Sequence, residues 1–197
     1  MNIQWLAAFV AFAFATAGTP GPNNLILAGI AANAGVRRAV PAIFGVSLGF
    51  SVMIAAAGLG LAGLFRQFPQ LATGLKWLGS AWLLYLAFRI AISAAATASD
   101  APGRIPGFWQ MAAFQWVNPK GWSMVLAMMG VYAGHNVDYD TDVLLMAALF
   151  SGIGTITATA WALLGSLARR WLNMRQMRWF NRIMALLLAL SVTLVWL

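Results

Sequence analysis

Six long apolar stretches, separated by short polar segments, constrain this chain more than any other feature. A helix needs about 20 mostly apolar residues to cross roughly 30 Å of hydrocarbon. The stretches run Ile3–Ala32, Ala39–Phe65, Trp77–Ala98, Phe108–Ala133, Val143–Ala168 and Trp179–Leu197. They are continuous, whereas the strands of a membrane barrel alternate in hydropathy over about ten residues. The sequence therefore predicts six transmembrane helices.

The composition agrees with a chain whose solvent is lipid. Hydrophobic residues make up 62% of the sequence and charged residues 8%, against roughly 25% charged residues in a soluble domain. No long polar linker divides the chain. We therefore expect an all-α, polytopic membrane protein with a single transmembrane domain over residues 1–197.

The basic residues predict how the helices are oriented. Lys and Arg in short loops stay cytoplasmic. The odd-numbered loops hold eight basic residues: Arg37, Arg38, Arg104, Arg169, Arg170, Arg175, Arg178 and Arg182. The even-numbered loops hold only Arg66, Lys76 and the acidic residues Asp138, Asp140 and Asp142. This asymmetry places the odd loops inside and both termini outside, and it accounts for the net charge of +8 without a nucleic-acid partner.

Two of the predicted helices are interrupted. The first contains Thr19-Pro20-Gly21-Pro22-Asn23-Asn24, and the fourth contains the segment from Gln115 to Gly121, with Asn118-Pro119-Lys120 at its centre. These helices open the two three-helix halves of the chain. A repeat of three helices must be inverted in the membrane, and interrupted helices at matching positions of inverted halves indicate a transporter site. A proline kink that only sets helix packing is the alternative for each interruption taken alone.

Each interruption offers two electrostatic poles. Asn118 is a good N-cap and Pro119 suits the first position of a restarting helix. In the first span, Thr19-Pro20 or the Asn23-Asn24 pair can play the same part. The restarting helix presents unsatisfied N–H groups that attract an anion. Carbonyl groups near Ala17 and Val117 form the complementary negative pole, so a zwitterion matches both.

Lys120 strengthens this hypothesis. A lysine within a membrane span is costly and usually faces a cavity, a partner or a transport path. The six predicted spans contain no Asp or Glu, so its partner must be backbone carbonyls, amides such as Gln115, water or a substrate carboxylate. The predicted substrate-binding residues are Thr19, Pro20, Gly21, Pro22, Asn23, Asn24, Gln115, Asn118, Pro119 and Lys120. Asn23, Asn24, Asn118 and Lys120 should converge near the midplane.

These motifs resemble the LysE/RhtB family of amino-acid exporters. The similarity extends from the Thr19–Asn24 run through Gly35, Arg37, Gly45, Gly49, Lys76–Gly79, Tyr85-Leu86 and Asn118–Lys120 to Asn181-Arg182. The segments Phe108-Trp109 and Phe114–Asn118 are also similar to the cysteine/O-acetylserine exporter branch. The resemblance implies an efflux carrier of the bacterial inner membrane, driven by the proton-motive force. No cofactor is expected, lipid is the expected surrounding partner, and self-association into a homo-oligomer is left open.

Two other classes of function compete with a carrier. A passive channel could also use paired broken helices. An intramembrane serine protease could use Ser47 of Gly45-Val46-Ser47-Leu48-Gly49, but the one histidine, His135, is predicted at the opposite side of the membrane. Gly45-x-x-x-Gly49, and similarly Gly130-x-x-x-Gly134, is better explained as a helix contact. His135 and the three aspartates form an acidic outer loop rather than a metal site.

The missing carboxylates also predict the charge of the substrate. A cationic side chain beside Lys120 would add a second buried positive charge, and burying an unpaired charge is expensive. We therefore expect export of neutral amino acids such as cysteine, O-acetylserine, threonine or homoserine, with dibasic amino acids excluded.

Overall fold

A computed structural model describes residues 2–61, 67–92 and 105–193, and all regular secondary structure in these ranges is helical. A π-helical segment, η1 (Ala57–Leu61), continues the third helix. The α-helices are α1 (Ile3–Gly18), α2 (Pro22–Ala34), α3 (Val36–Ala56), α5 (Pro69–Ala91), α6 (Phe108–Gln115), α7 (Pro119–Val131), α8 (Tyr139–Trp171) and α9 (Met174–Leu190). The prediction of an all-α chain is confirmed for the described residues.

Both predicted helix interruptions are present. α1 and α2 meet at a bend of 56°, and α6 and α7 are separated by residues 116–118. Pro22 and Pro119 each stand at the start of the downstream helix. A proline disfavours the helical conformation of the residue before it, and Gly21 and Asn118 are indeed extended. The local proline chemistry therefore accounts for the position of both breaks.

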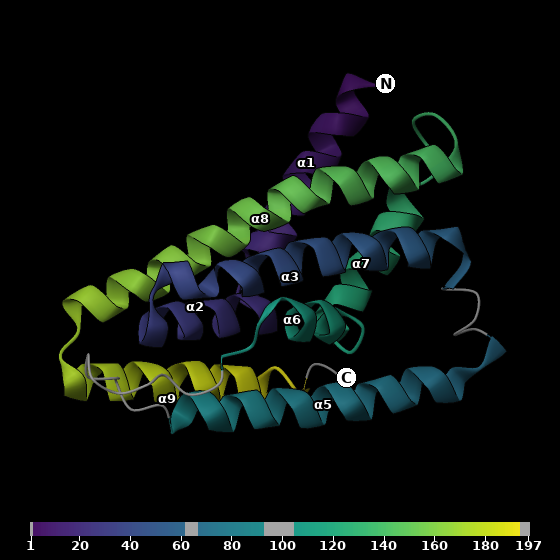
Figure 1. The fold of residues 1–197 in the computed structure, drawn as a ribbon. Coiled ribbons are helices and arrows are strands. Elements are labelled where there is room, and N and C mark those ends of the chain that lie inside the picture. The colour runs from purple at the N-terminus through teal and green to yellow at the C-terminus, as the bar shows by residue number, and fades with distance from the viewer. Residues whose placement is uncertain (1, 62–66, 93–104, 194–197) are drawn as a thin grey trace.

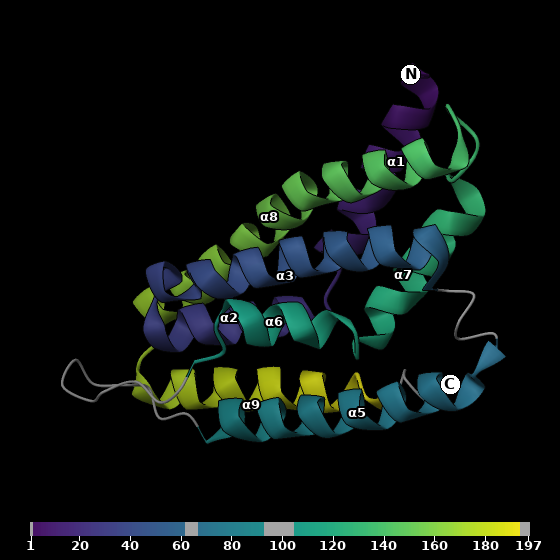
Figure 2. The same cartoon turned by 45° about the vertical axis from the view of Figure 1, so that its right-hand side comes forward.

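The long helices α3 and α8 form the centre of the molecule, and they run side by side in opposite directions (Figures 1 and 2). α1 and α2 pack on α8, and α6 packs on α3. α5 and α9 pack on each other as an antiparallel pair, which α2 joins to the rest of the bundle. The two interruptions lie between these layers, near the middle of the molecule (Figure 1).

Glycines permit the closest helix approaches. A Cβ atom at Gly49 would lie 2.6 Å from the Cα atom of Ala112, and one at Gly45 would collide with the carbonyl oxygen of Phe108. The predicted contact through Gly45-x-x-x-Gly49 is therefore confirmed, with α6 as the partner. The matching prediction for Gly130 and Gly134 is wrong. Gly130 has no neighbour within 4 Å of a Cβ position, and Gly134 lies beyond α7 with a φ of 77°.

The chain turns alternately at the two ends of the bundle (Figure 1). α2, α5 and α8 end at one end of the molecule, where α3, α6 and α9 begin. Basic residues gather there, with Arg37 and Arg38 in the first turn of α3 and Arg169 and Arg170 in the last turn of α8. The loop that carries Asp138 lies at the opposite end.

Two of the described helices are long and apolar enough to cross a membrane, namely Val36–Gly60 and Tyr139–Trp171, and the bent pair α1 and α2 makes a possible third span. The remaining predicted spans do not meet this test within the described residues. α6 and α7 are 8 and 13 residues long, each too short to cross by itself. α5 starts at Pro69 rather than Trp77, and α9 starts at Met174 rather than Trp179.

Parts of the predicted boundaries lie outside the described residues. The predicted span ends Phe65, Ala98 and Leu197 are among them, as are Arg66 and Arg104. Large apolar side chains are nevertheless exposed along the described helices, including Val52 on α3, Phe88 on α5 and Leu164 on α8. Such a surface suits hydrocarbon rather than water.

Candidate functional site

The two helix interruptions meet through the side chain of Lys120. This residue lies in the first turn of α7, and its Nζ atom donates hydrogen bonds across the molecule to the segment between α1 and α2. The acceptors are the hydroxyl group of Thr19 at 2.8 Å, the carbonyl oxygen of Thr19 at 2.9 Å and the carbonyl oxygen of Pro20 at 3.3 Å. The predicted choice of partners for Lys120 is thereby resolved in favour of backbone carbonyls, with a hydroxyl group added.

The start of α2 differs from the expectation. Neither Thr19-Pro20 nor the Asn23-Asn24 pair begins this helix, because Gly21 is the N-cap and Pro22 occupies the first turn. The Pro22 ring disfavours a helical Gly21, so the restart is set one residue before this proline. In the second interruption Asn118 is the N-cap as predicted, although its side chain makes no capping hydrogen bond.

A reciprocal amide pair joins α2 to α6. Asn23 Nδ2 donates to Gln115 Oε1 at 2.8 Å, and Gln115 Nε2 donates back to Asn23 Oδ1 at 3.1 Å. Gln115 Nε2 also donates to the carbonyl oxygen of Met111 at 2.7 Å. Gln115 is fully buried, so this pair satisfies a polar side chain that has no access to water. Gln115 therefore bonds to Asn23 and is not a partner of Lys120.

The carbonyl groups at the end of α1 are also occupied. Asn24 Nδ2 donates to the carbonyl oxygens of Ala17 and Thr19 at 2.8 and 2.9 Å, and Trp161 Nε1 donates to that of Gly18 at 3.1 Å. Around Val117, by contrast, α5 approaches closely, since a Cβ atom at Gly79 would collide with the Val117 carbonyl oxygen. The carbonyl oxygens that meet the cation are those of Thr19, which also accepts from Asn24, and Pro20, rather than those of Ala17 or Val117.

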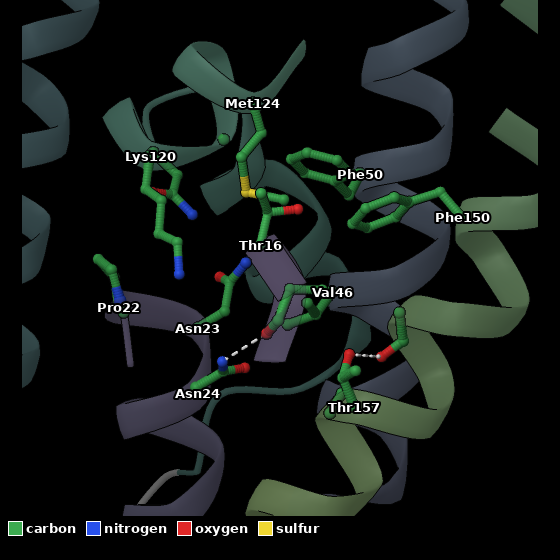
Figure 3. Close-up of a pocket in the computed structure, with 16 residues that line it drawn as sticks. Thr16, Pro22, Asn23, Asn24, Val46, Phe50, Lys120, Met124, Phe150 and Thr157 are labelled. Atoms are coloured by element: carbon green, nitrogen blue, oxygen red, sulfur yellow. Dashed lines mark hydrogen bonds between the residues drawn. The ribbon is translucent and has the colours of Figure 1, made fainter. Parts of the chain in front are cut away.

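A small cavity of about 40 Å³ lies beside these groups. Asn23, Asn24, Asn118 and Lys120, which were predicted to converge, all line it. In Figure 3 Lys120 and Asn23 reach into the same space from two helices, while Phe50 and Phe150 stand on its other side. A cavity of about 10–15 Å³ is enough to hold one water molecule, so this cavity admits a few water molecules.

A larger, open cavity of about 660 Å³ is also lined by Lys120. The interruptions contribute Pro20, Gly21, Pro22, Pro119 and Lys120 to its lining. The rest comes from α1, α2, α7, α9 and the residues after α9, and includes Phe12, Leu25, Ser123, Leu187 and Thr193. Lys120 therefore lines both cavities, and Thr19 and Pro20 are exposed.

Asn118 has an unsatisfied polar atom at this site. Its side chain is 1% exposed, and its Oδ1 atom has no hydrogen-bond partner in the described structure. Buried polar groups are nearly always hydrogen-bonded, so an exception calls for an explanation. Because Asn118 lines the small cavity, its free oxygen is placed to accept a hydrogen bond from a bound molecule.

Several residues of the small cavity had no signal in the sequence. They line it from the apolar and small-residue faces of α3, α7 and α8, and they include Val46, Phe50, Met124, Phe150, Gly154 and Thr157. Such residues look like ordinary helix-packing positions until the tertiary structure is known. Gly21 was predicted, but its role was not: a Cβ atom there would lie 2.7 Å from Lys120 Cδ, so glycine provides the space in which the lysine lies.

The groups that suggested other chemistry have structural partners. Ser47 is buried, and its hydroxyl group accepts a hydrogen bond from Thr155 Oγ1 at 2.9 Å. His135 lies in the loop between α7 and α8, where its ring contacts the carbonyl oxygen of Ala133. The carboxylate of Asp142 accepts hydrogen bonds from the backbone N–H groups of His135, Asn136 and Val137. This carboxylate therefore organises the acidic loop.

Comparison with known proteins identifies the family. Residues 14–195 match the family model described as LysE type translocator. A cysteine/O-acetylserine efflux protein of Salmonella typhimurium is 34% identical over 189 residues, which cover 95% of each chain. The protein of the same name from Escherichia coli O1:K1 is 34% identical over 95% of each chain. The one from Klebsiella pneumoniae is 30% identical over 99% of each chain.

No solved structure matches this chain, so the geometry above has no experimental counterpart for comparison. The family match covers both interruptions, and with them every residue of the candidate site. Together with the apolar helices, it makes the chain a membrane transport protein rather than an enzyme. The chain belongs to the LysE family of translocators.

Proposed function

We propose that this protein exports small neutral amino acids across the bacterial inner membrane. The observation that carries the proposal is the meeting of two helix interruptions at Lys120, with Thr19 and Pro20 as its partners. This arrangement places a cation, carbonyl oxygens and a helix N-terminus beside two cavities. A carboxylate and an ammonium group on one small molecule match those poles. The relatives named as cysteine/O-acetylserine efflux proteins favour substrates of the same class.

The binding residues of the proposed site come from both interruptions. Lys120 and the start of α7 bind the substrate carboxylate, and the acceptors at Thr19, Pro20 and Asn118 bind its ammonium group. Asn23, Asn24 and Gln115 hold the break in shape, while Gly21, Pro22 and Pro119 set its backbone. The small cavity is too small for an amino acid in this conformation. The substrate therefore enters through the larger cavity, and the smaller one widens during transport.

We propose that one transmembrane domain of six spans over residues 1–197 carries out this transport. In this arrangement α1 with α2 forms the first span, and α6 with α7 forms the fourth. The inverted-repeat hypothesis pairs α3 with α8 and α5 with α9, and each of these pairs packs antiparallel (Figure 2). The matching positions of the two interruptions support the same hypothesis. Alternating access then consists of movement of one half against the other around Lys120.

The proposed orientation has both termini outside. Arg37, Arg38, Arg169 and Arg170 gather at one end of the bundle, which the positive-inside rule assigns to the cytoplasm. The acidic loop around Asp142 then faces outward.

The charge of the site favours neutral substrates. No aspartate or glutamate is among the described residues that line either cavity. A cationic side chain about 4 Å from Lys120 would cost on the order of 4 kcal/mol at an effective dielectric constant near 20. Cysteine, O-acetylserine, threonine and homoserine avoid this cost, whereas lysine and arginine do not. If the proton-motive force drives export, the coupling must act without a carboxylate in these linings.

Counterflow in proteoliposomes tests this function. Proteoliposomes that contain the purified protein are loaded with an unlabelled amino acid. Uptake of labelled cysteine, O-acetylserine, threonine, homoserine or lysine into them is then measured. Lys120→Ala should abolish the flux, whereas Lys76→Ala, which changes the exposed lysine of α5, should not. Full transport by Lys120→Ala, or stronger inhibition by lysine than by every neutral amino acid, would contradict the proposal. Flux that never runs against a gradient would indicate a channel.

A further inference from the structure

We propose that the Lys120 ammonium group is a built-in occupant of the substrate's ammonium subsite, and that an amino acid binds by exchange with it. In the exchange the substrate carboxylate takes over Lys120, and the substrate ammonium group takes over the oxygens of Thr19 and Pro20. This inference rests on the proposed function, because it specifies how the same site recognises its substrate.

The number of hydrogen bonds is the first argument. A lysine ammonium group has three N–H donors and no acceptor. The Lys120 ammonium group makes three contacts, two with Thr19 and one with Pro20. All three donors are therefore used before any substrate arrives. A carboxylate can bind to this ammonium group only if at least one contact with Thr19 or Pro20 is given up.

The type of acceptor is the second argument. Two carbonyl oxygens and one hydroxyl oxygen within 3.3 Å of one nitrogen form a receptor for an ammonium ion. When Lys120 leaves, the Pro20 carbonyl oxygen and the Thr19 hydroxyl oxygen lose the hydrogen bond from Lys120, and the Thr19 carbonyl oxygen keeps only the one from Asn24 Nδ2. The ammonium group of an α-amino acid replaces the lost hydrogen bonds directly, since it has the same three donors and is attached to the carbon atom that bears the carboxylate. One substrate thus restores both sets of interactions.

The path of the Lys120 side chain is the third argument. The side chain lies against Gly21, where an added Cβ atom would be 2.7 Å from Lys120 Cδ and 2.9 Å from Lys120 Nζ. Gly21 has an extended backbone with a φ of −175°, which any residue adopts. The glycine is therefore needed here for space rather than for its conformational freedom. Because Thr19 and Pro20 are exposed and Pro20 lines the larger cavity, Lys120 can leave them without repacking of the helices.

The exchange predicts a specific form of selectivity. A lone amine would have to displace Lys120 without offering it a carboxylate, and the displaced charge would then repel the amine. A lone carboxylate would draw Lys120 away, and the oxygens of Thr19 and Pro20 would lose the three hydrogen bonds from its ammonium group without a replacement. Either fragment of an amino acid should therefore bind much more weakly than the whole. The amine fragment should gain affinity when the lysine is removed, and the carboxylate fragment should gain affinity when the lysine is kept but displaced from Thr19.

The test measures binding of three probes to the full-length protein in nanodiscs by calorimetry. The probes are L-cysteine, cysteamine and 3-mercaptopropionate. Cysteamine lacks the carboxylate of cysteine, and 3-mercaptopropionate lacks its amine. Lys120→Met should lower the Kd for cysteamine at least about tenfold and weaken cysteine binding. Lys76→Met, the same substitution at an exposed lysine, should change neither. An unchanged cysteamine affinity in folded Lys120→Met would overturn the exchange.

Gly21→Ala provides an independent arm that keeps the lysine. Its Cβ atom should push the flexible Lys120 side chain off Thr19, so the freed ammonium group should bind 3-mercaptopropionate at least about tenfold more tightly than in the unmodified protein. An unchanged affinity in this variant would also count against the exchange. Failure of the proposed function looks different: no neutral amino acid would bind or be transported by the unmodified protein, whatever the fragments do in the variants.

Discussion

The amide pair between Asn23 and Gln115 permits a quantitative test of how the first interruption is held. Asn23→Leu removes both hydrogen bonds of the pair and leaves Oε1 of the fully buried Gln115 without its donor. An unsatisfied buried group costs about 1–3 kcal/mol, so this is the expected loss in the free energy of unfolding. Gln115→Met should cost less, because the abandoned Asn23 lines a cavity and can bond to water there.

The double variant supplies the energy of the pair itself. Interhelical hydrogen bonds measured in a membrane protein average about 0.6 kcal/mol. For two such bonds, the loss in free energy of unfolding of the double variant Asn23→Leu with Gln115→Met should be smaller than the summed losses of the two single variants by about 1 kcal/mol. The measurement is unfolding in mixed micelles with increasing sodium dodecyl sulfate, followed by tryptophan fluorescence.

A matched control combines Gln115→Met with Ser151→Ala, a change on the exposed side of α8 where the hydroxyl group bonds only within its own helix. Sites without shared partners should be additive within about 0.5 kcal/mol. A coupling of Asn23 with Gln115 no larger than that of this control would refute the reasoning that the pair holds α2 to α6.

Three further outcomes are expected. Burial by itself would raise the pKa of the Asp142 carboxyl, but hydrogen bonds from the preceding loop residues Asn136, Val137 and His135 outweigh burial and lower the pKa below its ordinary value. The resulting stability is present at neutral pH and is lost as the pH falls below about 4. Asp142→Asn should lower the free energy of unfolding by about 2 kcal/mol at pH 7. In unfolding measured as a function of pH, this variant should lack the loss of stability on acidification that Asp142 causes. Gly49→Ala should destabilise the protein by about 1–3 kcal/mol because its Cβ atom meets α6, whereas Gly152→Ala, with open space around it, should be neutral or stabilising in the same unfolding assay. In this cysteine-free chain, an impermeant maleimide should label Arg170→Cys only from the cytoplasmic side and Asp138→Cys only from outside; the reverse pattern would overturn the proposed orientation.

Local sequence rules predicted the helical class and the two interruptions. Each rule acts within about one helical turn: a proline excludes the helical conformation just before it, and an apolar run of sufficient length specifies a helix suited to hydrocarbon. The same local rules placed Asn118 and Pro119 correctly. They did not decide among the candidate starts of α2, because Pro20 and Pro22 compete there and the structure uses Gly21 with Pro22.

What the sequence by itself determined is therefore the class of the protein, the position of its interruptions and the uneven distribution of its charges. What only the tertiary structure decided is which groups meet. Lys120 binds Thr19 across 101 residues of sequence, and Asn23 pairs with Gln115 across 92. α2 is tied to α9 in the same way, through reciprocal bonds between Asn33 and Asn181. These partners depend on how closely whole helices approach, through contacts such as that of Gly49 with Ala112, and no rule acting within one helical turn contains that information.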